Sequence, residues 1–175
     1  LPTYISNTLQ LSIYVVLLSL FFGVPSAALI TQTNLKTKRY LRWLLLLPLA
    51  MPGYVIAYLY TDLFDYAGIV QNSLRAWFGW QSPHDYWFFD LRTLGGASFI
   101  LALVLYPYVY MLARTAFEQQ DKNLLRASRT LGLNAKQAFF NIGLPLARPA
   151  IMVAATLVMM ETIADFATVQ YFAVN

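Results

Sequence analysis

Cysteine is absent from this chain, histidine occurs once, and charged residues are scarce. Without cysteine the chain has no disulfide and no thiolate metal site, and one histidine excludes a site built from several imidazoles. Charged residues make up 11% and apolar residues 59% of the 175 positions, whereas soluble domains carry about 25% charged and about 45–50% apolar residues. So little charge cannot cover a globular surface of this size, and we expect apolar side chains to face lipid.

The usual signals for catalysis and for nucleotide binding are also missing. No lysine follows a glycine, which excludes the phosphate-binding pattern G-x-x-x-x-G-K-[ST]. His84 stands alone in a polar loop, so neither a Ser/His/Asp arrangement nor a metal role is expected there. The net charge of +4 comes from basic residues beside apolar segments, which indicates membrane topology rather than nucleic acid. We therefore expect a non-catalytic chain that binds no cofactor and contacts membrane lipids.

Long apolar segments dominate the chain in place of charge. About 20 apolar residues are enough to cross the hydrocarbon core of a bilayer. Spans are expected at about residues 9–30, 43–60, 95–113 and 149–172. In the first of them, Gly23 permits the close approach of another helix. In the second, Pro48 and Pro52 should bend or unwind the helix, because proline lacks an amide hydrogen and clashes with the preceding turn. The pattern predicts a single all-α membrane domain over residues 1–175 with about four transmembrane helices.

Two further features concern the edges of these spans. Residues 69–80 place apolar side chains near one helical face, which predicts a short interfacial helix; aromatic anchoring is favoured there over docking of a partner protein. Tyr106, Tyr108 and Tyr110 alternate along the third span, so we expect them around the helix axis as packing or pore-edge residues. The chain does not begin with Met and ends beside an apolar stretch. We therefore expect a part of a longer protein that lacks at least one span.

The lysines and arginines beside the spans predict the orientation. Four of the twelve lie in the first loop, two in the loop 61–94 and six in the segment 114–148. Positive residues stay on the cytoplasmic side. The N-terminus and the loop 61–94 are therefore expected outside, and the two basic segments inside.

Glu161 and Asp165 are acidic residues inside the fourth expected span. Four residues apart, they should share one helix face. A charged carboxylate facing lipid at the membrane centre costs about 2.5 kcal/mol or more, so the pair should face the bundle or a water-filled cavity. Oxygen ligands suit hard cations. We interpret the pair as part of a translocation pathway that contacts a cation transiently, without a firm metal site. The alternatives are protonated or paired structural groups and a proton relay.

The polar segment 121–148 has an internal order of its own. Apolar residues recur at helical spacing from Leu124 to Leu131, and Gly132 fits a left-handed helix stop. Asn134 and Gln137 have the spacing of a capping box at the start of a second helix. Gly143 and Pro145 should end that helix. The sequence thus predicts two short basic amphipathic helices with a sharp bend between them.

The same segment resembles the EAA loop of the permeases of binding-protein-dependent (type I) ABC importers. The usual form is Glu-Ala-Ala, three residues, Gly, nine residues and Ile-x-Leu-Pro. The chain matches it at Ala127, Gly132, Ile142, Leu144 and Pro145 and departs from it at Arg126 and Ser128, where the family has Glu and Ala. A narrower stretch, from Met160 to Phe172, is similar to the permeases of ferric-iron importers. The two motifs together cover a minority of the chain.

The resemblance implies a permease subunit in the bacterial inner membrane, with the N-terminus periplasmic and residues 121–148, here called the coupling segment, cytoplasmic. It implies three protein partners: an ABC ATPase subunit that uses the ATP, a periplasmic binding protein, and a second permease domain, fused or separate, as a homodimer or heterodimer. The residues expected to couple to the ATPase are Arg126, Ala127, Ser128, Arg129, Gly132, Phe139, Ile142, Leu144 and Pro145.

Ferric iron is the substrate that the second motif favours. The alternatives within the family are thiamine, phosphonate, sulfate or a similar small solute. Outside the family, the candidates are an ion-coupled secondary transporter that uses Glu161 and Asp165 as its relay, and a membrane scaffold without transport. The spacing of the coupling segment argues against both of these, because neither needs it.

Overall fold

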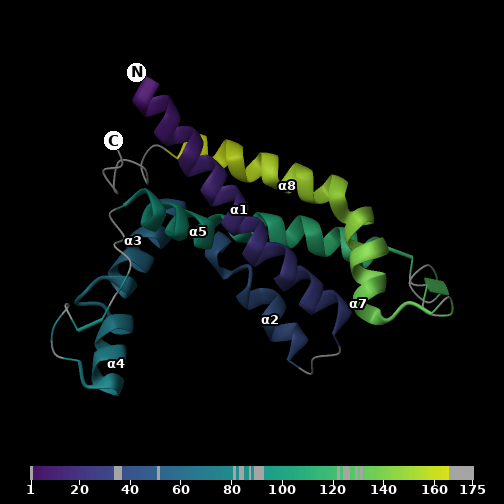
Figure 1. The fold of residues 1–175 in the computed structure, drawn as a ribbon, viewed down its shortest axis with the longest axis horizontal. Coiled ribbons are helices and arrows are strands. Elements are labelled where there is room, and N and C mark those ends of the chain that lie inside the picture. The colour runs from purple at the N-terminus through teal and green to yellow at the C-terminus, as the bar shows by residue number, and fades with distance from the viewer. Residues whose placement is uncertain are drawn as a thin grey trace.

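The structure is a computed structural model, and every regular element in the part of the chain that it describes is a helix (Figure 1). It describes residues 2–33, 37–50, 52–80, 82, 85–86, 88, 93–121, 123, 127–128, 130 and 132–165. Three helices in these ranges are long and apolar enough to cross a membrane: Ile5–Gln32, Leu94–Gln119 and Ala135–Ala164. The predicted all-α membrane fold is confirmed.

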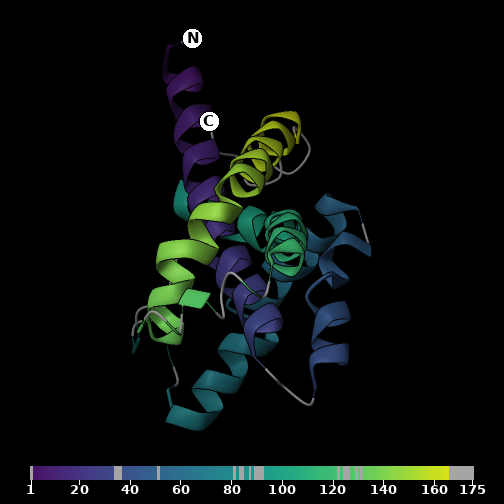
Figure 2. The same ribbon diagram turned by 90° about the vertical axis from the view of Figure 1, so that its right-hand side faces the viewer.

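Helix α5 (Leu94–Gln119) is the centre of the packing. It lies against α1 (Pro2–Gln32) and α8 (Leu144–Ala164), which also contact each other. Figure 2 views α5 nearly end-on, with α1 and α8 on two sides of it. Val15, Ile100 and Val158, one from each of these helices, are fully buried in the core between them.

Helices α1 and α5 approach each other closely at Gly23. A Cβ added there would lie 2.6 Å from the Cβ of Val109, so no residue larger than glycine fits without movement. This confirms the expectation that Gly23 lets another helix approach closely. Of the three alternating tyrosines, Tyr110 is fully buried and Tyr108 is only half-buried. This difference agrees with the expectation that the three side chains point in different directions around the helix axis.

The second apolar segment is broken. It consists of α2 (Lys38–Leu44), the 3₁₀ helix η1 (Leu47–Ala50) and α3 (Gly53–Phe64). Pro48 lies within η1, and Pro52 precedes α3 in an extended conformation, with φ −55° and ψ 138°. The unwinding expected at the two prolines is confirmed, since neither can donate the hydrogen bond that a continuous helix needs. The expected span 43–60 is consequently not a single helix.

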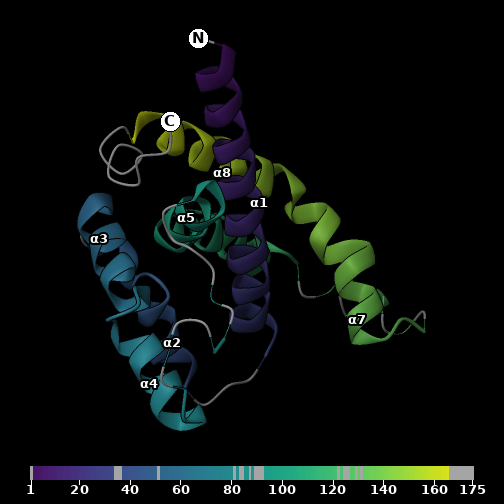
Figure 3. The same ribbon diagram turned by 60° about the vertical axis from the view of Figure 1, so that its left-hand side comes forward.

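Helix α4 (Ile69–Phe78) confirms the short helix expected within residues 69–80. Figure 3 shows α3 and α4 following one another along one side of the molecule, away from α7. A left-handed Gly79, with φ +72°, ends the helix. Arg75 donates hydrogen bonds to the Tyr86 hydroxyl and to the Tyr66 carbonyl, which fasten α4 to its flanking loops. Trp77 is 88% exposed, as an anchor in a headgroup region would be.

Two helix ends differ from the expectation. Helix α5 runs to Gln119 rather than to residue 113, because the polar pair Arg114 and Glu118 supports the additional turns as an i,i+4 ion pair. Helix α8 ends at Ala164, and residues 166–172 of the expected fourth span lie outside the described part of the chain.

The largest correction concerns the join between the coupling segment and the last span. The second short helix, α7 (Ala135–Ala138), continues through a π-helix, η2 (Phe139–Gly143), directly into α8. The helix end expected at Gly143 and Pro145 is therefore wrong, as is the span start expected at Pro149. Gly143 is right-handed, with φ −61° and ψ −50°. The Leu144 amide donates five residues back, to Phe139, and Pro145, which has no N–H, follows where the helix returns to the α pattern.

Candidate functional site

A cavity of about 370 Å³ lies where the break in the second apolar segment faces α5 and the end of α8. We call it the carboxylate cavity. Its lining residues are Pro48, Leu49, Pro52, Gly53, Tyr54, Val104, Leu105, Tyr108, Glu161, Ala164 and Asp165. The structure thus brings together the two acidic residues singled out from the sequence, both prolines of the broken segment and one of the three alternating tyrosines.

Glu161 and Asp165 reach this cavity from different backbone settings. Glu161 lies in the last turn of α8, whereas Asp165 is the first residue beyond the helix, with φ −82° and ψ 68°. The Asp165 amide donates to the Glu161 carbonyl over 2.9 Å. The two residues therefore do not share one continuous helix face as expected, although both line the same space. A Cβ added to Gly53 would lie 3.8 Å from Oδ2 of Asp165, so the start of α3 lies beside that carboxylate.

The charged groups of this lining are two carboxylates among mostly apolar residues. None of the described lining residues is Lys, Arg or His, so ionised Glu161 and Asp165 would give the cavity a negative potential. Hard cations prefer such oxygen ligands. Within the described ranges, no group of three or more His, Cys, Asp or Glu side chains could hold a metal ion.

The described parts of the coupling segment have the turn chemistry expected from the sequence. Gly132 has φ +90°, the left-handed region that favours glycine. The capping box is formed in both directions: Asn134 Oδ1 accepts from the Gln137 amide over 2.8 Å, and Gln137 Oε1 accepts from the Asn134 amide over 3.0 Å. Ser128 is buried.

The remaining residues expected at the coupling surface are less uniform in their placement. Arg126 and Arg129 lie outside the described residues, as do Leu124, Leu125 and Leu131. Ala127 is exposed, and Ile142, Leu144 and Pro145 are half-buried in the continuous helix η2–α8. Phe139 packs inward against Phe117, with the ring centroids 5.5 Å apart, and the neighbouring Phe140 is 53% exposed. Phe140, which the sequence reasoning passed over, therefore presents the aromatic surface that was expected from Phe139.

A second cavity of about 470 Å³ lies between the ends of α1 and α5, helix α2 and helix α7. We call it the junction cavity. Gln120 and Phe139 line it, and Gln120 Nε2 donates to the Gly143 carbonyl over 2.7 Å. Arg42 and Glu118 line it as well and form an ion pair. Sequence reasoning missed these polar contacts. Only the i,i+4 spacing of Arg114 and Glu118 gave a local signal, because Arg42 is 76 residues away from its partner.

Comparison with known proteins gives consistent matches. Residues 12–175 match the family described as "Binding-protein-dependent transport system inner membrane component". The chain is 32% identical over 168 residues to the molybdenum transport system permease protein ModB of Escherichia coli (strain K12), covering 96% of this chain and 70% of that protein. It is 29% identical over 162 residues to the ferric transport system permease protein FbpB of Actinobacillus pleuropneumoniae, covering 93% and 23%. Over 141 residues it is 32% identical to the maltose/maltodextrin transport system permease protein MalF of Salmonella typhimurium (strain LT2), covering 79% and 27%.

Proposed function

Because the chain belongs to the family of binding-protein-dependent transport system inner membrane components, we propose that it is the permease subunit of an ATP-driven importer that carries ferric iron. An ABC ATPase subunit hydrolyses the ATP, and a periplasmic binding protein delivers the substrate. A second permease domain completes the path. The N-terminus faces the periplasm and the coupling segment faces the cytoplasm, in accord with the six Lys and Arg residues between 114 and 148.

The observation that supports this proposal most directly is the carboxylate cavity. It combines the break in the second apolar segment with two acidic side chains, Glu161 and Asp165. Irregular backbone is tolerated inside a membrane only where it is buried in protein or lines a water-filled space, and acidic side chains are tolerated there under the same condition. A water-filled passage for a polar substrate would accommodate both the irregular backbone and the two acidic side chains. Ferric iron, a hard cation, matches its oxygen lining.

Molybdenum is the second candidate substrate. It is supported by the identity to ModB, which is 32% against 29% for FbpB. Molybdenum dissolves in neutral water as an oxyanion, and two ionised carboxylates would repel it. Transport of the oxyanion would therefore need Glu161 or Asp165 to be protonated or turned away. The chemistry of the cavity favours iron, and the degree of identity favours molybdenum.

The coupling segment supplies the contact with the ATPase in this proposal. The exposed Phe140 and the residues around Gly132 seat against the ATPase, and Arg126 and Arg129 meet acidic groups at its edge, which sets association and register more than affinity. Closure of the ATPase subunits moves the segment as a rigid body, and the cavity changes its exposure from one side of the membrane to the other.

Uptake measurements separate the candidates. Cells that carry or lack the gene for the full-length protein are given radioactive iron or radioactive molybdate at limiting concentration, with sulfate, phosphonate and thiamine as further solutes. The proposal expects iron uptake to depend on the gene and on ATP. Dependence of molybdate uptake alone would assign the second candidate. Uptake that survives inactivation of the ATPase but collapses with the proton gradient would assign an ion-coupled transporter and overturn the importer proposal.

A further inference from the structure

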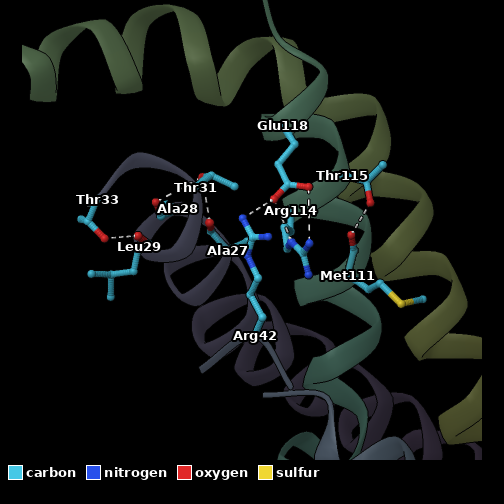
Figure 4. Close-up of polar contacts among 10 residues, drawn as sticks. All are labelled: Ala27, Ala28, Leu29, Thr31, Thr33, Arg42, Met111, Arg114, Thr115 and Glu118. Atoms are coloured by element: carbon cyan, nitrogen blue, oxygen red, sulfur yellow. Dashed lines mark hydrogen bonds and ion pairs between the residues drawn. The ribbon is translucent and has the colours of Figure 1, made fainter. Parts of the chain in front are cut away.

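One carboxylate joins two helices, the end of α5 and α2, at the junction cavity (Figure 4). Oε1 of Glu118 lies 3.2 Å from Nη2 of Arg42 and 3.0 Å from Nε of Arg114. Arg114 and Glu118 stand in the last turns of α5, and Arg42 belongs to the last turn of α2. The bridge therefore connects the end of α5 to the short helix that precedes the break in the second apolar segment.

The end of α5 is also fastened to the coupling segment. Gln120, the residue that follows α5, donates its side-chain hydrogen bond to the Gly143 carbonyl in η2 over 2.7 Å. One turn earlier, Phe117 packs on Phe139 of η2, and both rings belong to a core cluster with Tyr110 and Ala147. Glu118 lies between these two attachments along the chain. A displacement of α7 and η2 must therefore displace the backbone that carries Glu118.

Helix α2 is held much more weakly. None of its residues is buried, and its Leu41 is only partly buried against the core cluster at the end of α5. Beyond α2 the chain enters η1, where Pro48 and Leu49 form one wall of the carboxylate cavity. A shift of α2 is therefore carried over a few residues into that wall.

We propose that Glu118 is a positioning residue that transmits movement of the coupling segment through Arg42 to α2 and so to the wall of the carboxylate cavity. This inference rests on the proposed importer function and adds a route between its two sites. The side chains of Arg42 and Glu118 are 37% and 39% exposed, and ion pairs this exposed contribute little to stability. The bridge therefore sets the position of α2 rather than the stability of the fold.

The absence of cysteine makes a direct test of this route practical. Tyr54 lies on α3, just beyond that wall, and lines the carboxylate cavity. Any cysteine outside residues 1–175 of the full-length permease is first replaced by serine, and Tyr54→Cys then adds one thiol at the cavity. The permease is reconstituted in vesicles with its ATPase and binding protein. The rate at which a membrane-impermeant maleimide labels this thiol is measured with and without ATP, together with ATP hydrolysis and substrate uptake. A Trp77→Cys variant, with its thiol on exposed α4, shows the labelling expected away from the cavity.

Glu118→Gln should uncouple the wall from the ATPase. Single residues on a coupling route change coupling by about 2- to 30-fold, and we expect uptake per ATP hydrolysed to fall within that range. The ATP-dependent change in Tyr54→Cys labelling should shrink with it, whereas assembly with the ATPase is kept. Arg42→Gln should behave in the same way. The matched control is Arg39→Gln on the same helix, because Arg39 forms no ion pair with a described residue; it should leave uptake per ATP unchanged.

Exchange of the two charges distinguishes positioning from a general loss of structure. The double variant Arg42→Glu/Glu118→Arg restores an ion pair between α2 and α5 but loses the pair with Arg114. We therefore expect it to recover part of the uptake per ATP that either single substitution loses. The inference is overturned if Glu118→Gln retains wild-type uptake per ATP and ATP-dependent labelling, or if the exchanged pair stays as impaired as the single variants. If the Tyr54→Cys permease with Arg42 and Glu118 intact neither binds the ATPase nor changes its labelling with ATP, the importer function itself fails.

Discussion

Replacing Gly23 with alanine should weaken the contact between α1 and α5. A Cβ at this position would lie 2.6 Å and 2.7 Å from the Cβ and Cγ1 atoms of Val109 and 3.0 Å from the Tyr106 carbonyl oxygen. Carbon atoms in good contact are about 3.5–4.0 Å apart, so the two helices must separate by roughly 1 Å at this point. Forcing an extra methyl group into a packed interior costs about 1–3 kcal/mol.

A smaller effect acts in the opposite direction. Alanine is more favourable than glycine inside a helix by about 0.5–1 kcal/mol. The steric cost should exceed this gain, because the atoms that meet the new methyl group are the Val109 Cβ and a backbone carbonyl, which cannot rotate away. We expect a net destabilisation of about 1 kcal/mol. For a chain of this length that corresponds to a fall in Tm of about 2–4 °C.

Thermal unfolding of the detergent-solubilised protein, followed by circular dichroism, measures this difference. Gly95→Ala is the matched control, because the added Cβ would meet only Thr93 Oγ1, at 3.9 Å, among the described neighbours within 4 Å. Val109→Gly opens space at the same contact, so the double variant Gly23→Ala/Val109→Gly should lose less stability than the sum of the single losses. A Gly23→Ala protein that melts at or above the temperature of Gly95→Ala would refute the packing argument.

Three further outcomes are expected. Glu161→Ala should impair uptake by the full-length importer, because the Glu161 side chain lines the carboxylate cavity. The amount of importer assembled in the membrane should stay unchanged, because this side chain is exposed. Full uptake by the variant would contradict the pathway role of Glu161. Gly132→Val should reduce ATPase coupling without removing the protein from the membrane, because a backbone φ of +90° disfavours L-residues by about 1–2 kcal/mol. Gly132→Asn should have a milder effect. Equal uptake by the wild type, Gly132→Val and Gly132→Asn would contradict this prediction. Gly68→Ala should loosen the attachment of α4, because the added Cβ would collide with the Asp62 carbonyl oxygen. Limited proteolysis should then cut near α4 faster than in the wild type. An unchanged cleavage rate would contradict this prediction.

Sequence reasoning was reliable where the structure follows from a residue's own backbone chemistry. Pro48 and Pro52 cannot donate amide hydrogen bonds, so the break in the second apolar segment could be read from their positions alone. Gly132 and the capping pair Asn134 and Gln137 were equally readable, because a left-handed turn and a capping box depend on neighbours within a few residues. The placement of Glu161 beside the broken segment was only partly predictable: the cost of a carboxylate in lipid demanded a cavity, but not which helices would form it.

The failures have a common physical cause, which is that a residue's usual tendency can be overridden by its context. Gly143 and Pro145 are typical of a helix end, yet η2 widens by one residue and carries the helix through them. Phe139 was expected at the surface, but the ring of Phe117, 22 residues earlier, draws it inward. The ion pair between Arg42 and Glu118 could not be predicted from the sequence, because no local pattern relates two residues 76 positions apart.

The corrected helix join changes how movement can reach the carboxylate cavity. Had the second short helix ended at Gly143, the coupling segment and the last span would be separate bodies with a hinge between them. Instead, Ala135–Ala164 forms one continuous helix, about 45 Å long at 1.5 Å per residue, with Glu161 near its far end. On the proposed route, a push on α7 reaches Glu161 along this helix, whereas the opposite wall at Pro48 receives the same push through Gln120, Glu118 and Arg42. The two walls are linked to one segment by paths of different stiffness. Because the bridged path is the weaker one, its loss should leave a cavity in which one wall still responds to ATP, so uptake should fall in part rather than stop.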